Sequence, residues 1–116
     1  MNEKLIQLAF YLENEVPDDK FDMSQWSSEC GTIACALGWG TRIFIGLVLV
    51  PDAHGSGEIG IKFTDHNHQQ HHALHAATAC FGIPYEEAGN IFFDNSYVDP
   101  TKANVIKRIR EHALHS

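Results

Sequence analysis

Apolar residues recur every three or four positions near the start of the chain, with charged residues between them. This spacing places the apolar side chains on one face of a helix, so it predicts an amphipathic helix over about residues 2–15. Pro17 ends the pattern, because proline lacks the N–H group that a continuing helix needs. The apolar positions of this helix are Leu5, Leu8, Ala9 and Leu12.

The segment from Thr32 to Gly40 alternates small residues with larger apolar ones. Thr32 can cap a first helical turn by accepting a backbone N–H bond, which predicts a helix that begins there. Small residues four positions apart, such as Ala34 and Gly38, let another backbone approach closely, so we expect this helix to be buried. The aromatic residues expected to anchor the core around it are Trp26 and Trp39.

Two short runs rich in β-branched and large apolar residues follow, at residues 47–50 and 59–63. Residues 51–58 between them are mostly turn formers, with a proline and two glycines among them. Strand-forming runs separated by turn formers are typical of a β-hairpin, which we predict here.

The second half of the chain predicts three further helices. The first is expected to be capped by Thr64 or Asp65, to run through a group of histidines, and to end at Gly82 in the left-handed conformation. Pro84 opens a short helix over residues 85–93. Its inward positions are Ala88, Ile91 and Phe92.

The last helix is expected to take Asp99 as its N-cap, with Pro100 in its first turn. Its apolar positions are Val105, Ile106, Ile109 and Leu114. No internal repeat or long linker divides the chain, and 44% hydrophobic residues are enough to fill one core. We therefore predict a single domain over residues 1–116, of the α+β class but mainly helical. It has about five helices and one small β-hairpin around the buried small-residue helix.

Charge, apolar run length and cysteine content indicate which partners and which cellular location to expect. Eight Lys and Arg residues against fifteen Asp and Glu residues give a formal charge of -7, which repels phosphate backbones, so nucleic acid is not an expected partner. The longest apolar run, residues 43–50, is far shorter than the roughly 20 residues that cross a bilayer. The start of the chain lacks the features of a secretory signal, and three cysteines form no disulfide framework. We therefore expect a cytoplasmic protein with no membrane partner.

Residues 26–39 carry a motif that consists of a tryptophan, a Cys-Gly-Thr triplet, a cysteine and a Gly-Trp pair. The motif resembles one found in a family of small uncharacterised bacterial and phage proteins, whose members also carry a later Phe-Gly-Ile or Phe-Gly-Leu and an aromatic Ile-Phe. The matching residues are Trp26, Cys30-Gly31-Thr32, Cys35, Gly38-Trp39, Phe81-Gly82-Ile83 and Ile91-Phe92. The resemblance covers residues 21–93 and implies a shared fold, with no activity attached to it.

Five of the eight histidines lie between residues 66 and 75. On the expected helix, residues four apart share a face, so His68 with His72, or His71 with His75, would place two imidazoles on one divalent ion such as zinc or nickel. Two ligands hold an ion weakly, and no glutamate completes the zinc-protease motif. The alternative is a polar helix face with exposed imidazoles. A third ligand would come from His54, Cys30 or His112, or from a partner chain.

Cys30 is the candidate reactive thiol. If a helix begins at Thr32, the Cys30 thiol lies near unsatisfied backbone N–H groups, which lower a thiol pKa. With a downstream histidine as base, this arrangement suits a thiol hydrolase, although residues 31–35 do not match the papain-like signature. Cys35 is expected to be buried, as free cysteines commonly are.

Residues 75–91 fit the helix-turn-helix template, with small, apolar and turn residues where the motif needs them. The helix that would enter DNA, however, carries Glu86 and Glu87 near its start and is followed by no Lys or Arg before Lys102. We therefore interpret the segment as an ordinary helical corner. The cations of the last helix that we interpret as a solvated face are Lys107, Arg108 and Arg110.

The sequence contains no complete catalytic triad, phosphate loop or full set of metal ligands. We therefore expect a small interaction or accessory domain that binds another protein and has no self-contained catalysis. The alternative is a metal-binding protein, or a metal-dependent or thiol-dependent hydrolase that uses the histidines of residues 66–75 or Cys30. The sequence leaves the oligomeric state open.

Overall fold

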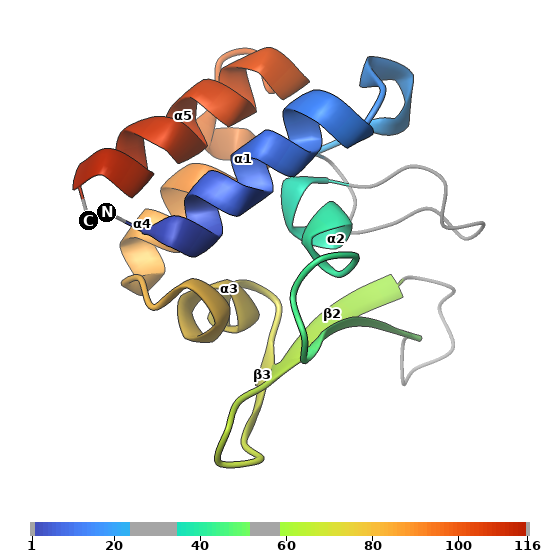
Figure 1. Ribbon diagram of the computed structural model, residues 1–116, viewed down its shortest axis with the longest axis vertical. Coiled ribbons are helices and arrows are strands. Elements are labelled where there is room, and N and C mark those ends of the chain that lie inside the picture. The colour runs from blue at the N-terminus through green and yellow to red at the C-terminus, as the bar shows by residue number, and fades with distance from the viewer. Residues whose placement is uncertain (1, 24–34, 52–58, 116) are drawn as a thin grey trace.

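The computed structural model describes residues 2–23, 35–51 and 59–115, and these residues form five α-helices and one small antiparallel sheet (Figure 1). The helices are α1 (Glu3–Glu15), α2 (Ala36–Gly40), α3 (Leu74–Phe81), α4 (Tyr85–Phe92) and α5 (Lys102–His115). The strands are β1 (Leu47–Pro51), β2 (Ile59–Thr64) and β3 (Gln70–His72), and short 3-10 helices lie at Asp18–Lys20 and Asp94–Ser96. The predicted α+β, mainly helical fold is confirmed. None of the helices described has both the length and the apolar content needed to span a membrane.

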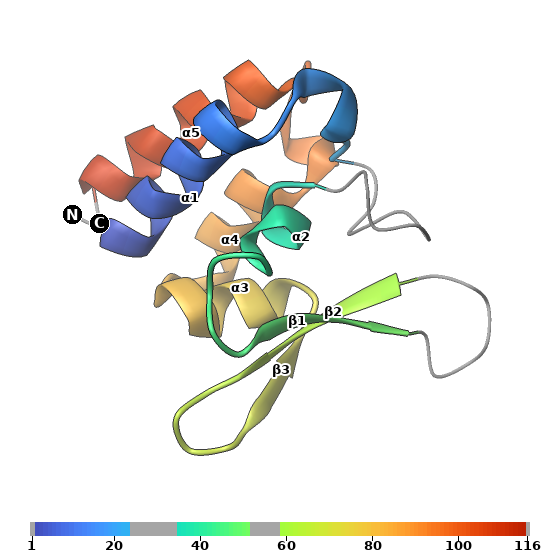
Figure 2. The ribbon, with the colours of Figure 1, turned by 45° about the vertical axis from the view of Figure 1, so that its right-hand side comes forward.

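α1 and α5 lie side by side and run in opposite directions (Figures 1 and 2). The backbone N–H of Asn2 donates to the Ala113 carbonyl at 2.9 Å. At the other end of α1, Lys102 Nζ donates to the Val16 carbonyl at 2.6 Å. The predicted apolar face of α1 is confirmed, because its four residues are fully buried. They are Leu5, Leu8, Ala9 and Leu12.

The first residues of the chain also tie α1 to the end of α3. Asn2 Oδ1 accepts the backbone N–H of Leu5 and so caps α1, while Asn2 Nδ2 donates to the Phe81 carbonyl at 2.8 Å. Lys4 Nζ donates to the Cys80 carbonyl at 2.9 Å. The last carbonyls of a helix have no partner within it, and a cation there also interacts favourably with the helix dipole. The side chains of Lys4 and of Asn2, the N-cap of α1, therefore complete the C-terminal end of α3.

The sheet has the strand order β1-β2-β3, and the predicted hairpin of β1 and β2 is confirmed. In its antiparallel register Leu47 pairs with Phe63 and Leu49 pairs with Ile61. Leu47, Phe63 and Ile61 are buried, and α3 packs against β2 and β3. The sheet thus turns one face to the core of the domain.

The predicted helix that begins at Thr64 or Asp65 is wrong in its first half. The Asp65 carboxylate accepts backbone N–H bonds from Asn67 at 2.9 Å and from Gln69 at 3.0 Å, which closes a tight turn. The chain then pairs with β2 as the strand β3, so the helix α3 starts only after this strand. The side chain expected to cap a helix instead closes a hairpin.

The predicted end of the same helix is confirmed. Gly82 has φ of 68° and donates its backbone N–H to the Thr78 carbonyl at 2.9 Å. Pro84 precedes α4, and α3 and α4 form the helical corner that the sequence indicates. The inward residues of α4 are buried as predicted: Ala88, Ile91 and Phe92.

α2 is shorter than the predicted small-residue helix. Its N-cap is Cys35, whose Sγ accepts the backbone N–H of Gly38 at 3.4 Å. Ala36 and Gly38 are buried, so the expectation of a buried helix is confirmed for this part. The predicted cap, Thr32, lies outside the residues that the structure describes.

Trp39 lies at the edge of the core and not within it. The ring packs against buried residues, and its indole N–H donates to the Lys20 carbonyl at 3.0 Å. Arg42 lies over this ring, with its guanidinium carbon 5.8 Å from the ring centroid. The expected burial of Trp39 is therefore only partial, while Trp26 lies outside the described residues.

α5 differs from the prediction at both ends. Thr101, and not Asp99, caps the helix, because its Oγ1 accepts a backbone N–H bond of the first turn at 3.3 Å. Near the other end Ala113 is buried and Leu114 is 65% exposed. The buried positions recur every four residues from Val105, so the stripe ends on Ala113 and leaves Leu114 outside the core.

Two adjacent phenylalanines provide a test of this core. The ring of Phe92 is stacked on that of Phe81 and is 2% exposed, whereas Phe93 is 47% exposed. We expect Phe92→Ala to lower the free energy of unfolding by about 3–5 kcal/mol, because it empties a packed site. The matched change Phe93→Ala should cost less than about 1 kcal/mol. Chemical denaturation of both variants measures this, and equal losses would contradict the assignment.

Candidate functional site

The histidines selected from the sequence do not share a helix face. His68 lies in the β2–β3 turn with φ of 64°, His71 and His72 lie on β3, and His75 lies in the first turn of α3. Neighbouring residues on a strand point to opposite faces, so the side chains of His71 and His72 point apart. The interpretation of His68 with His72, and of His71 with His75, as pairs on one helix is therefore wrong.

Two other contacts show histidines holding helices together. The His75 ring lies against the Tyr85 ring with centroids 4.8 Å apart, which joins α3 to α4. His112 Nδ1 lies 2.9 Å from Glu87 Oε1, which joins α5 to α4. Within residues 2–23, 35–51 and 59–115, no group of three or more histidine, cysteine or acidic side chains is placed to hold a metal ion. Zinc or nickel binding stays a prediction, and its candidate ligand His54 lies outside these ranges.

Asp65 organises the turn in which these histidines lie. Its Oδ1 accepts the backbone N–H groups of Asn67 and Gln69, and its Oδ2 lies 2.9 Å from His71 Nε2. The hydrogen bond with His71, followed by the bonds from the two backbone N–H groups, holds the pKa of Asp65 below its ordinary value. The hairpin tip is therefore built around an ionised carboxylate.

The thiols that the structure describes are not nucleophiles. Cys35 and Cys80 are free and buried, and burial raises the pKa of each thiol to about 11. At neutral pH both are protonated, and the thiolate is the reactive form. The predicted burial of Cys35 is confirmed. Cys30 lies outside the described residues, so its reactivity stays a prediction.

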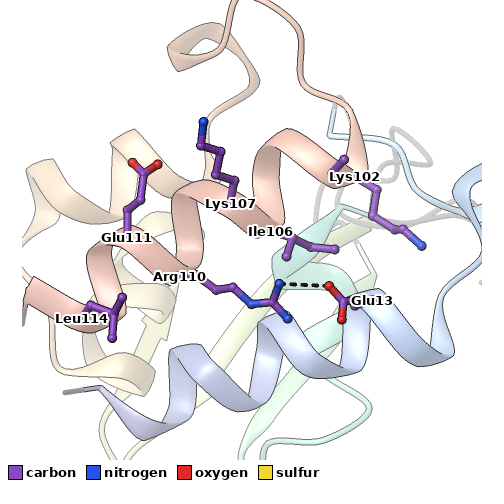
Figure 3. Close-up of a pocket in the computed structure, with 8 residues that line it drawn as sticks. Glu13, Lys102, Ile106, Lys107, Arg110, Glu111 and Leu114 are labelled. Atoms are coloured by element: carbon purple, nitrogen blue, oxygen red, sulfur yellow. Dashed lines mark hydrogen bonds and ion pairs between the residues drawn. The ribbon is translucent and has the colours of Figure 1, made fainter.

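A hollow of about 420 Å³ lies on the outer side of α5, beside α1 (Figure 3). Ile106 is buried below it, and Ala103 leaves space at one end because its side chain is a single methyl group. The residues that line the hollow are Glu13, Lys102, Ala103, Ile106, Lys107, Arg110, Glu111 and Leu114. The hollow therefore combines apolar and charged side chains on one helix surface.

Two ion pairs near this hollow join α5 to α1 and to the 3-10 helix at Asp18–Lys20. Arg110 Nη1 lies 2.9 Å from Glu13 Oε2, and this bond keeps the pKa of Glu13 below its ordinary value. Lys102 Nζ lies 3.0 Å from Asp18 Oδ1 and is largely covered. The charges of Arg110 and Lys102 are thus balanced within the chain. Exposed pairs contribute little stability, so the buried apolar faces of α1 and α5 determine how the two helices pack.

The sequence indicated that the cations of α5 form one solvated face, and Arg108 does not follow this prediction. Arg108 Nη1 donates to the Asn90 carbonyl at 3.0 Å and to the Ser96 carbonyl at 2.7 Å. Its guanidinium carbon also lies 3.9 Å from the centroid of the Tyr97 ring. The interpretation of Arg108 as solvated is wrong, because this side chain joins α5 to the segment that follows α4.

Two large apolar side chains are exposed on α1 and α5, and one of them, Leu114, lines the hollow. Phe10 on α1 is 63% exposed, and Leu114 on α5 is 65% exposed. The ion pair of Glu13 with Arg110 sets the antiparallel register, and one turn further along, Phe10 and Leu114 lie at the same level of the two helices. We call the outer surface made by these residues the α1–α5 face. It consists of Phe10, Glu13, Ala103, Ile106, Lys107, Arg110, Glu111 and Leu114.

The sequence analysis missed this face because it placed Leu114 in the core. Ala103, Lys107, Arg110 and Leu114 are separated by four, three and four residues, which puts them on one side of a helix. This spacing was the available indication. It was hidden because Ala113, next to Leu114, fits the buried stripe equally well in the sequence pattern.

Comparisons of the chain with protein-family models, with curated proteins and with solved structures find no match. The resemblance to small bacterial and phage proteins therefore stays a prediction. Most of its motif, residues 26–34, falls outside the residues that the structure describes.

Titration of Asp65 provides a test of the hairpin geometry. The pKa of Asp65 is lower in the folded protein than its unfolded value of about 3.9. The bonds of the Asp65 carboxylate therefore stabilise the hairpin fully at pH values above about 3.9. This stabilisation is lost as the pH falls through the folded pKa. We expect the amide chemical shifts of Asn67 and Gln69 to report a midpoint below about 3.9. His71→Ala should move this midpoint upward. A wild-type midpoint at or above the ordinary value would contradict the bonded geometry.

Proposed function

We propose that this protein is an interaction domain that binds another protein chain through the α1–α5 face and carries no catalysis of its own. The observation that supports this most is the exposed Leu114 beside a hollow on α5, together with the exposed Phe10 on the neighbouring antiparallel helix α1. Clustered apolar side chains at the surface, with charged groups around them, are typical of protein-binding sites.

Other exposed apolar residues are less suited to docking. Ile45 and Val98 are fully exposed, but each lies in a connecting segment, before β1 and before α5 respectively. Single apolar side chains at the surface are normal and need no partner. Ile45 therefore serves as a matched control for Leu114, because it is a similar exposed side chain in the segment before β1 and not on α1 or α5.

The proposal includes a protein partner and a cytoplasmic location. The formal charge of -7 disfavours association with nucleic acid phosphates. Free thiols such as Cys35 and Cys80 persist in a reducing compartment, which supports the cytoplasm. The alternatives, metal binding at the histidines and thiol hydrolysis at Cys30, receive no support from the residues that the structure describes.

Site-specific photo-crosslinking tests this proposal. A photoreactive phenylalanine analogue is placed at Leu114, at Phe10 or at Ile45, and cells that express each variant are irradiated. We expect discrete protein adducts from positions 114 and 10, identified by mass spectrometry of the linked peptides, because these side chains border the docking surface. Position 45 should give few adducts or none.

Circular dichroism of each purified variant confirms that the fold is retained. Adducts that form equally at all three positions would indicate random collisions. Folded variants that give no protein adduct from positions 114 and 10 would refute an interaction through this face.

A further inference from the structure

β1 is an edge strand, and its outer edge carries main-chain groups that pair with no other strand described (Figure 2). We infer that this edge binds an extended segment of another protein, which adds a fourth strand to the sheet. The outer edge is defined by the main-chain groups of residues 47–51 that point away from β2. It is separate from the α1–α5 face, so the inference goes beyond the proposed function.

The register of the sheet determines which main-chain groups lie on the outer edge. The Thr64 N–H donates to the Gly46 carbonyl at 3.0 Å, so these two residues form a hydrogen-bonded pair. Such pairs alternate with non-hydrogen-bonded pairs along an antiparallel ladder, so Val48 and Val50 also point their main-chain groups toward β2. The residues whose main-chain groups point away from β2 are Leu47, Leu49 and Pro51.

The outer edge offers three carbonyl groups but only one N–H group. The Leu47 N–H already donates to the Phe44 carbonyl at 3.3 Å, and Pro51 has no N–H group. The Leu49 N–H is therefore the single donor, and no residue that the structure describes bonds it or the Leu49 carbonyl. A strand edge with unpaired N–H and C=O groups is a template for another strand.

The side chains of β1 lack the charges that commonly protect an edge strand. Residues 47–50 are all leucine or valine. Val48 is 43% exposed on the outer face of the sheet, and Leu49, on the inner face, is only partly buried. The other edge strand, β3, has only three residues and leads directly into α3. β1 is therefore the edge at which a further strand would cover apolar surface.

The numbers of donors and acceptors exclude a second copy of β1 as the occupant. Two copies paired antiparallel across Leu49 exchange only the two Leu49 bonds. Pro51 of each copy lies opposite Leu47 of the other, and these positions have no available N–H between them. Their carbonyl groups would face each other without donors, which is costly.

A different extended segment with all its N–H groups fits the same edge better. It exchanges two bonds with Leu49 and donates one bond to the carbonyl of Leu47 and one to that of Pro51. It therefore forms twice as many bonds as β1 of a second copy. The formal charge of -7 also disfavours a second copy and favours a segment without acidic residues.

Alternate side chains of the segment meet opposite faces of the sheet. The residue opposite Leu49 lies beside its partly buried side chain on the inner face, and the flanking residues lie beside Val48 and Val50 on the outer face. Apolar and β-branched side chains suit these positions, because cross-strand pairs of this kind stabilise a sheet. The occupant is thus an extended segment of about five such residues, without proline at the pairing positions.

The outer edge ends before Ile45. Gly46 has φ of 90°, and the Leu47 N–H donates back to the Phe44 carbonyl, so the chain turns just before β1. A segment that pairs with residues 47–51 stops at this turn. The photoreactive variant at Ile45 therefore remains a control for the α1–α5 face.

Hydrogen exchange of the full chain, with a synthetic peptide as the probe, tests the inference. The probe is Lys-Thr-Val-Thr-Val-Thr-Val-Thr-Lys with every threonine N-methylated, so that one hydrogen-bonding edge remains and the peptide does not pair with itself. A short peptide loses conformational freedom on pairing, so we expect a dissociation constant of roughly 0.1 mM. Saturating probe should slow exchange of the Leu49 amide by at least about tenfold, and exchange of the Val48 and Val50 amides far less, since these are already bonded to β2.

One added methyl group provides the matched control peptide. N-methylation of the central valine as well removes the N–H that pairs with Leu49 and should weaken binding by at least about tenfold. On the protein, Leu49→Pro removes the only donor of the edge, and proline is tolerated where the strand N–H points away from the sheet. It should also weaken binding by at least about tenfold, whereas Leu49→Ala keeps the N–H and should stay within about threefold of the wild type. Circular dichroism checks both folds, and the two peptides on the wild-type chain give the result even if Leu49→Pro does not fold.

Three results would overturn the inference. The first is exchange of the Leu49 amide at an unchanged rate with about 1 mM probe, roughly ten times the expected dissociation constant. The second is equal binding of the two peptides to the wild-type chain. The third is a probe that protects amides of α1 and α5 alone, since that places the extended segment on the α1–α5 face.

Discussion

The fold depends on the burial of one helix, α1, and on the hydrogen bonds that fix both of its ends. Its apolar stripe is fully buried, and Asn2 and Lys4 donate to the last carbonyls of α3, which lie 79 and 76 residues away in the chain. Those carbonyls have no partner within α3, and leaving them buried without one would be costly. The start of the chain is therefore needed both to fill the core and to complete another helix.

The packing of α1 also fixes the position of α5 and therefore of its exposed side chains. α5 is held along α1 by the Asn2 backbone, by Glu13 on Arg110 and by the Val16 carbonyl on Lys102, so its outer residues are presented by two helices in a fixed relation. A surface that is already ordered loses little conformational freedom when a partner binds. This order is the physical basis of the proposed interaction surface.

Local patterns in the sequence predicted the elements whose structure is set locally. The periodicity of α1, the β1–β2 hairpin and the left-handed Gly82 were all correct, because spacing and turn chemistry determine them. The pattern failed where pairing with another strand determines the structure. Residues 70–72 pair with β2 once Asp65 has closed the turn. The helix on which the metal hypothesis depended is therefore not formed there. It also failed at Leu114, since either Leu114 or Ala113 could continue the buried stripe and only the packing against α1 selects Ala113.

The central claim is that the first residues of the chain cap α1 and complete the end of α3, and removal of one side chain tests it directly. Asn2→Ala removes both the cap of α1 and the donor to the Phe81 carbonyl, so it should lower the free energy of unfolding by more than the roughly 1 kcal/mol of an N-cap alone. Asn14→Ala is the matched control, because the Asn14 side chain makes one exposed hydrogen bond within α1. Chemical denaturation measures both variants, and a loss for Asn2→Ala no larger than that for Asn14→Ala would contradict the account.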